Sequence, residues 1–127
     1  MFEGNQYDSN IPIYLQIMEK IKQRIVSGEW KSGERIPAVR ELALEFGVNP
    51  NTMQRALSEL EREGLLFSER TAGRFITRDS RLIEEIREQM AEELISRFLT
   101  RMRRLGYSGE EVRCKLLSRH TKDPDGE

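Results

Sequence analysis

The sequence predicts a mainly α-helical domain with one short β-hairpin, followed by a two-helix extension. Apolar residues recur at helical spacing between residues 11 and 64, which indicates amphipathic helices. Two short apolar segments, 65–67 and 75–77, flank a polar loop, as in a hairpin. A long apolar stripe begins near residue 80. A chain of 127 residues accommodates one small domain and such an extension.

Four segments follow from this pattern. Residues 1–10 are polar and are expected to form a flexible arm. Residues 11–78 form the predicted domain, and residues 79–119 form the helical extension. Residues 120–127 have the composition of a disordered tail.

The composition excludes several classes of protein and gives no global support for nucleic-acid binding. The net charge is −1, so any basic surface must be local. The single cysteine, Cys114, excludes an intramolecular disulfide and fits a reducing cytosol, so we expect a cytoplasmic protein. No apolar run approaches the roughly 20 residues that a membrane span needs, and no secretory signal is evident, so no membrane partner is expected.

The first predicted helix runs from Pro12 to Ser27 and forms the centre of the domain. Isoleucines recur every fourth residue along it, at Ile13, Ile17, Ile21 and Ile25. After it, Trp30 is expected to pack over the domain as an anchor. Arg35 and Ile36 suggest a short strand, and Pro37 is predicted to occupy the first position of the second helix.

Two helices joined by a glycine turn follow. Pro37–Phe46 has one apolar face, Gly47–Asn49 forms the turn, and Val48–Gly64 contains the next helix. Asn49 is a suitable N-cap with Pro50 after it, and Gly64 is a suitable stop. One face of this helix is apolar, at Met53, Ala56, Leu57 and Leu60. Together these elements predict a helix-turn-helix.

The polar face of the Val48–Gly64 helix is electrically asymmetric. Its first half carries Asn51, Thr52, Gln54 and Arg55 and no carboxylate, whereas its second half carries glutamates. Such an amino end can approach a polyanion, as a recognition helix does in the major groove. This helix alone fits an ordinary solvent-exposed amphipathic helix equally well, and the preceding helix and turn favour the recognition helix.

The hairpin predicts a wing beside that helix. Its loop carries polar and cationic residues together with a glycine, which permits close approach of the backbone to another surface. Arginines there can lie along phosphates or in the minor groove. The alternative is a solvated hairpin tip. The loop residues expected to contact DNA are Arg70, Thr71, Gly73 and Arg74.

Ile13–Thr77 resembles the winged helix-turn-helix domain of the GntR family of bacterial transcription regulators. The resemblance rests on several motifs in order: Pro12-Ile13-Tyr14, Ser32-Gly33-Glu34-Arg35-Ile36-Pro37-Ala38-Val39-Arg40-Glu41-Leu42-Ala43, Val48-Asn49-Pro50-Asn51-Thr52 with Ala56-Leu57, and Glu61-Arg62-Glu63-Gly64-Leu65. The short extension is similar to that of the YtrA-like subfamily.

The resemblance assigns DNA-binding roles to particular residues. It implies that Arg40 reaches a base or a phosphate, and that Asn49, Asn51 and Thr52 begin the recognition helix. Gln54 stands where several members have arginine, and Arg55 follows it. Gly73 matches the wing glycine. The sequence departs from the family at Ala38, where serine is usual, and at the wing tip, which lacks the usual Gly-Lys pair.

The extension is predicted to mediate dimerisation. Ser80 is a candidate cap for a helix from Arg81 to Leu105, and Ser108 begins a capping box for a second helix ending near Arg119. The apolar stripe of the long helix is too large for a soluble monomer to leave exposed. A twofold partner or folding back onto the winged domain would cover it, and we favour the partner. The predicted interface residues are Ile83, Ile86, Met90, Leu94, Phe98, Met102 and Leu105.

The sequence gives no support for catalysis, and no catalytic residue, cofactor or metal site is expected. The only histidine, His120, lies in the predicted tail, and Cys114 has no ligand partner at zinc spacing and is expected to be a semi-buried packing residue. Two functions remain. The favoured one is a homodimeric, sequence-specific regulator, a repressor, on double-stranded palindromic operator DNA. The alternative is a winged helix that binds proteins. Either no small-molecule effector exists, or one binds between subunits.

Overall fold

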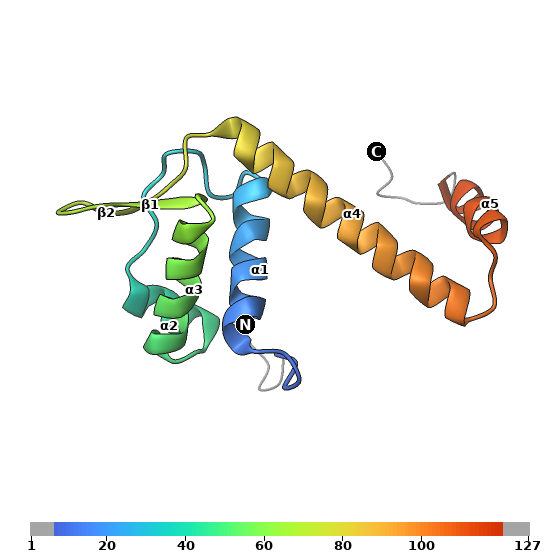
Figure 1. The fold of residues 1–127 in the computed structure, drawn as a ribbon, viewed down its shortest axis with the longest axis horizontal. Coiled ribbons are helices and arrows are strands. Elements are labelled where there is room, and N and C mark those ends of the chain that lie inside the picture. The colour runs from blue at the N-terminus through green and yellow to red at the C-terminus, as the bar shows by residue number, and fades with distance from the viewer. Residues whose placement is uncertain (1–6, 121–127) are drawn as a thin grey trace. The chain divides into compact units, whose positions relative to one another are not determined.

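The computed structural model describes residues 7–120 and contains five helices and one two-stranded antiparallel sheet in that range. The elements divide into two compact units, one extending to Arg87 and the other beginning at Glu88. Figure 1 labels the elements. Their bounds are α1 Ile13–Val26, α2 Val39–Phe46, α3 Pro50–Arg62, β1 Leu66–Glu69, β2 Gly73–Ile76, α4 Ser80–Arg104 and α5 Gly109–His120.

The core of the first unit lies between α1, α2, α3 and the base of the hairpin (Figure 1). Burial of large aliphatic side chains, each contributing about 1.5–3 kcal/mol, stabilises this arrangement. Three of the four predicted isoleucines of α1 are buried, but Ile13 is 42% exposed because it lies at the first, open turn of the helix. Trp30 is buried, which confirms its predicted role as an anchor.

The helix-turn-helix is confirmed in detail. The backbone N–H of Asn51 donates to Oδ1 of Asn49 at 2.7 Å, so Asn49 caps α3, and Pro50 is the first helical residue. All four predicted apolar residues of α3 are buried. Gly64 has φ +88, which ends the helix in the left-handed region. The prediction for Pro37 is wrong, because α2 begins at Val39 with Ala38 as its extended N-cap.

The hairpin pairs Leu66 with Ile76 and Glu69 with Gly73, so the connecting loop contains only residues 70–72. The predicted strand at Arg35 and Ile36 is reduced to a single bridge, Arg35 to Phe75. The segment nevertheless runs along β2, because the N–H of Ile36 donates to the carbonyl of Arg74 at 3.0 Å. The wing is therefore held along one edge by the chain that leads into α2.

The residues preceding α1 also contact this unit. Residues 1–6 of the predicted flexible arm lie outside the described residues, whereas Tyr7 Oη donates to the carbonyl oxygen of Phe46 at 2.7 Å. Asp8 and Gln16 are joined by hydrogen bonds of 2.8 and 2.7 Å. The last part of the predicted arm is thus tied to α1 and α2.

The cap of α4 is Asp79 and not Ser80. Oδ1 of Asp79 accepts from the N–H groups of Arg81 and Leu82 at 3.1 and 3.2 Å. The first turns of α4 pack against the core of the first unit through Leu82, Ile83 and Ile86. A carboxylate one residue earlier thus supplies the acceptor expected of the serine.

The second unit contains the rest of α4 and α5. The predicted capping box is confirmed by two bonds, Ser108 N–H to Glu111 Oε1 at 2.8 Å and Glu111 N–H to Ser108 Oγ at 3.1 Å. Val112 is buried, whereas Cys114 is exposed, so the prediction of a semi-buried Cys114 is wrong. His120 ends α5, and the rest of the predicted tail, residues 121–127, lies outside the described residues.

Candidate nucleic-acid interface

The amino end of α3 presents polar side chains to solvent without a carboxylate. Its first turn contains no acidic residue, and the first glutamate of the helix is Glu59. Asn51, Gln54 and Arg55 are exposed, and Thr52 is half-buried. The Asn49 cap already accepts from the N–H of Asn51, and the positive end of the helix dipole adds to this donor-rich surface. This end of α3 is therefore suited to meet an anionic partner.

Three of the predicted contact residues in α3 and at its cap have intramolecular roles. The side chain of Asn49 accepts from the helix backbone, as described above. Gln54 Nε2 donates to Ser58 Oγ at 3.2 Å, which extends its amide along the helix surface. The guanidinium of Arg55 lies 3.9 Å from the ring centroid of Tyr14 in α1. Asn49 shapes the site, and Gln54 and Arg55 remain exposed on its surface.

Arg40 is an exposed cation in the first turn of α2. Within residues 7–120 its guanidinium forms no ion pair. Ala38 has no side-chain acceptor for the first N–H groups of α2, while Glu41 accepts from the N–H of Ala38 at 3.1 Å. The charge of Arg40 and the donors of this helix end are thus available to an external anion.

The wing divides its two predicted arginines between different roles. Arg70 and Thr71 are exposed in the loop between the strands. Arg74 points instead towards α3, where its Nε lies 3.2 Å from Oε1 of Glu61, and its side chain is only 19% exposed. Arg70 therefore remains a candidate DNA contact, whereas Arg74 ties the wing to α3.

Arg35 is a further exposed cation of this surface, beyond the residues predicted to contact DNA. A Cβ built on Gly73 would lie 2.9 Å from Nε of Arg35, so the Arg35 side chain crosses the wing backbone at that glycine. Gly73 has φ +110, a conformation that other residues rarely adopt. The close approach expected at this glycine is thus made by Arg35. In an extended segment successive side chains point to opposite sides, so an arginine beside a buried isoleucine is the sequence signal for an exposed cation at Arg35.

A shallow groove of about 430 Å³ lies between the wing and the segment that leads into α2. It is lined by residues 35–39 on one side and by residues 68–74 on the other. Arg35 and Arg70 are exposed at its walls, together with one exposed carboxylate, Glu69. The groove therefore has a small excess of positive charge, in a chain whose net charge is −1.

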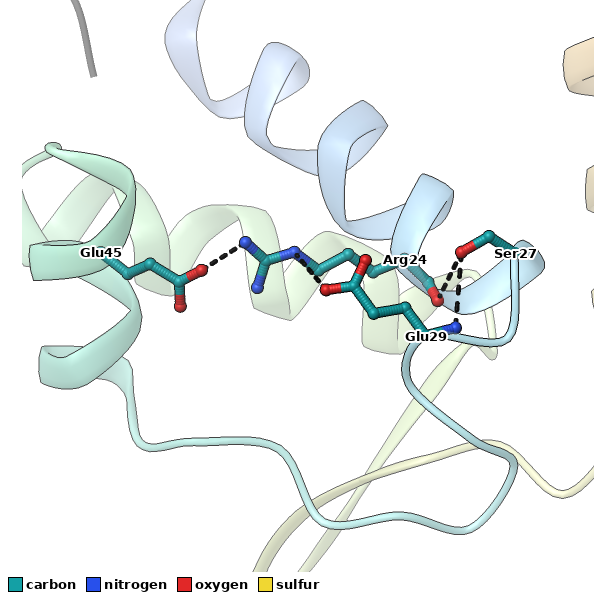
Figure 2. A network of polar contacts seen from close by, with 4 residues as sticks. All are labelled: Arg24, Ser27, Glu29 and Glu45. Carbon is teal, nitrogen blue, oxygen red and sulfur yellow. Dashed lines mark hydrogen bonds and ion pairs between the residues drawn. The ribbon is translucent and has the colours of Figure 1, made fainter. Parts of the chain in front are cut away.

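A network centred on Arg24 fixes α2 against α1. Figure 2 shows the guanidinium between the carboxylates of Glu45, in α2, and Glu29, which follows α1. The Nε–Oε2 distance to Glu29 is 3.8 Å. The guanidinium also lies 5.2 and 4.8 Å from the ring centroids of Trp30 and Phe46. Because Phe46 immediately precedes the turn into α3, this network helps to set the position of α3.

Neither a metal site nor a membrane segment is found in the part of the chain that the structure describes. Across residues 7–120, no three histidine, cysteine or acidic side chains are placed to hold a metal ion together. In the same range no helix combines the length and apolar character needed to cross a bilayer.

The three-helix core, the donor-rich end of α3 and the adjoining hairpin together define a winged helix-turn-helix of the DNA-binding class. Residues 13–76 match the family described as "Bacterial regulatory proteins, gntR family". The chain belongs to the GntR family of transcription regulators, which is not a family of enzymes.

Two relatives from Bacillus subtilis (strain 168) match most of the chain. The HTH-type transcriptional regulator YhcF is 40% identical over 108 residues, which cover 85% of this chain and 89% of YhcF. The HTH-type transcriptional repressor YtrA is 39% identical over 93 residues, which cover 68% of this chain and 72% of YtrA. The predicted likeness to the YtrA-like subfamily is thereby confirmed.

Two solved structures support the fold. A GntR family transcriptional regulator from Listeria monocytogenes has a TM-score of 0.79 at 36% identity, covering 88% of this chain and 98% of that chain. The DNA-binding domain of AraR in complex with operator ORR3 has a TM-score of 0.51 at 32% identity, covering 61% and 94%. The second is a domain of the same kind bound to DNA.

Proposed function

We propose that this regulator binds double-stranded operator DNA through the amino end of α3, with α2 and the wing on either side. The observation that carries the proposal is the cluster of exposed donors on α3, in a turn without any carboxylate. A helix of this kind reads base edges with its first residues. In this arrangement Asn51, Thr52 and Gln54 face the bases, and Arg40 and Arg70 meet a base edge or the phosphates.

The extension, residues 79–119, joins two copies in this proposal. Across residues 88–119, six large apolar side chains are between 40% and 73% exposed, a surface that monomeric proteins seldom leave open to water. They are Leu94, Ile95, Phe98, Leu105, Leu116 and Leu117. A second copy carries the same surface and can cover it by twofold symmetry.

Two of the predicted interface residues have another partner. Ile83 and Ile86 pack against the winged core, so the proposed interface begins at Met90. Met90 and Met102 are half-buried, and the exposed Leu94, Ile95 and Phe98 lie between them in the sequence. Thioether side chains adapt easily to such a surface, which suits a contact between copies.

A dimer of winged domains reads a palindrome. Each copy contacts one half-site, and the symmetry of the protein is matched by the symmetry of the DNA, with half-site centres about 34 Å apart or a multiple of this. The relative YtrA is named as a repressor, which favours repression for this protein too, in the cytoplasm where the chromosome lies. The proposal requires no cofactor.

Selection of DNA sequences from a random duplex library by the full chain tests this function. We expect enrichment of an inverted repeat, with binding to the selected duplex far tighter than to random DNA and strongly salt-dependent. Failure to enrich any sequence would contradict the proposal. It would favour the alternative of a winged helix that binds protein.

A further inference from the structure

The side chain of Arg55 in α3 is stacked on Tyr14, a residue 41 positions earlier in the first helix. The centre of its guanidinium lies 3.9 Å from the ring centroid, the shortest of the cation–ring distances found in residues 7–120. Tyr14 is half-buried and packs against the winged core, so its ring is a fixed platform. Arg55 itself is exposed.

The stacking leaves the hydrogen-bonding groups of Arg55 available. A guanidinium that rests on a ring through its flat face keeps its N–H donors in the plane, pointing past the edge of the ring. In residues 7–120 Arg55 forms no ion pair, in contrast to Arg24, Arg62 and Arg74, which are each paired with a glutamate. Arg55 is thus an unneutralised cation held in one orientation beside the donor-rich end of α3.

We propose that Tyr14 is a positioning residue that holds the guanidinium of Arg55 for a phosphate of the DNA backbone. The contact with Tyr14 directs Arg55 towards α1, at one side of α3. Gln54, in contrast, is exposed on the surface of α3. A cation at the flank meets the wall of the groove, which is made of phosphates. The helix α1, which carries Tyr14, then contributes to DNA binding indirectly, because Tyr14 orients Arg55 of α3. This inference rests on the proposed function.

A double-mutant cycle tests the coupling between the two residues. The proteins are the parent chain, Tyr14→Leu, Arg55→Gln and the double variant, with Tyr14→Phe as the variant that keeps the ring. The matched charge control is Arg62→Gln, on the same helix and 79% exposed. Affinities are measured by fluorescence anisotropy on the selected duplex and on random duplex at several salt concentrations.

The expected results separate positioning from folding. Arg55→Gln should weaken binding to both duplexes equally and reduce the salt slope by about 0.9 per site, as the loss of one phosphate contact requires. Tyr14→Leu should weaken binding about 2- to 5-fold when Arg55 is present, and not at all in the Arg55→Gln protein. Tyr14→Phe and Arg62→Gln should bind as the parent does.

Several results would overturn the inference. Equal losses from Tyr14→Leu in both backgrounds would mean that Tyr14 acts only through folding, and urea unfolding followed by Trp30 fluorescence would show the matching loss of stability. An unchanged salt slope in the Arg55→Gln protein would show that Arg55 does not contact a phosphate. If the parent binds DNA and the cycle is additive, only this inference fails. If the parent enriches and binds no duplex, the proposed function fails as well.

Discussion

Replacing Arg24 by methionine is expected to destabilise the winged unit, because one guanidinium joins α1, α2 and the buried tryptophan. Methionine keeps most of the aliphatic stem and removes the charge. The change eliminates the ion pairs with Glu45 and Glu29 and the cation–π contacts with the rings of Trp30 and Phe46. The side chain of Arg24 is 22% exposed, so these contacts are only partly screened by water.

The size of the effect follows from the exposure of the partners. The two carboxylates are 63% and 46% exposed, so both rehydrate when Arg24 is lost and no buried charge is left unpaired. Partly exposed ion pairs contribute about 0.2–1 kcal/mol each, and a cation on a ring about 0.5–1 kcal/mol. Allowing for overlap among these contacts, we expect a loss of about 1–2 kcal/mol. A domain of this size would melt about 5–15 °C lower.

Trp30 provides the assay, because it is the only tryptophan in the chain and lies beside Arg24. Its fluorescence during urea or thermal unfolding reports on the first unit. The matched control is Arg62→Met, whose side chain is 79% exposed and makes one pair with Glu59, and which should change stability by less than about 0.5 kcal/mol. Identical unfolding midpoints for the two variants would refute the role assigned to the Arg24 network.

Three further predictions concern DNA binding, the wing and dimerisation. Arg40→Ala should weaken operator binding by about 1–3 kcal/mol if Arg40 contacts a guanine, and an equal loss on random DNA would make it a phosphate contact. Gly73→Ala should destabilise the unit by about 1–3 kcal/mol, because its φ of +110 is strained for alanine and the new Cβ meets Arg35 at 2.9 Å; unchanged urea unfolding would contradict this. Phe98→Glu should weaken self-association at least 30-fold in sedimentation, because each of the two copies loses roughly 1 kcal/mol of apolar burial. The control Ser96→Glu should leave self-association unchanged. A Phe98→Glu protein that sediments with the same mass as the parent would exclude this interface.

The helix-turn-helix could be predicted from the sequence because local rules determine it. The cap at Asn49, the stop at Gly64 and the buried face of α3 each depend on residues within one or two turns of the chain. The capping box from Ser108 to Glu111 is local in the same way. Tertiary packing reinforces these preferences and does not change them.

The partners of the cations could not be predicted, because they are chosen by tertiary packing. The pairing of Arg74 with Glu61 and the stacking of Arg55 on Tyr14 join elements that are 13 and 41 positions apart in sequence. The sequence shows that Arg74 is a cation, but it does not show that Arg74 forms an ion pair with Glu61 of α3. The approach of Arg35 to Gly73 depends in the same way on how the segment before α2 lies along β2.

The most direct test of DNA binding through the carboxylate-free end of α3 is a salt titration with paired charge variants. Binding of the selected duplex should fall by roughly 1,000-fold or more between 50 and 200 mM salt if at least six phosphates are contacted. Replacing Asn51 by aspartate, which places an anion at that end, should abolish this binding, whereas Ser58→Asp, two turns further along the helix, should reduce it far less. A flat salt response, or equal losses for the two aspartates, would contradict the account.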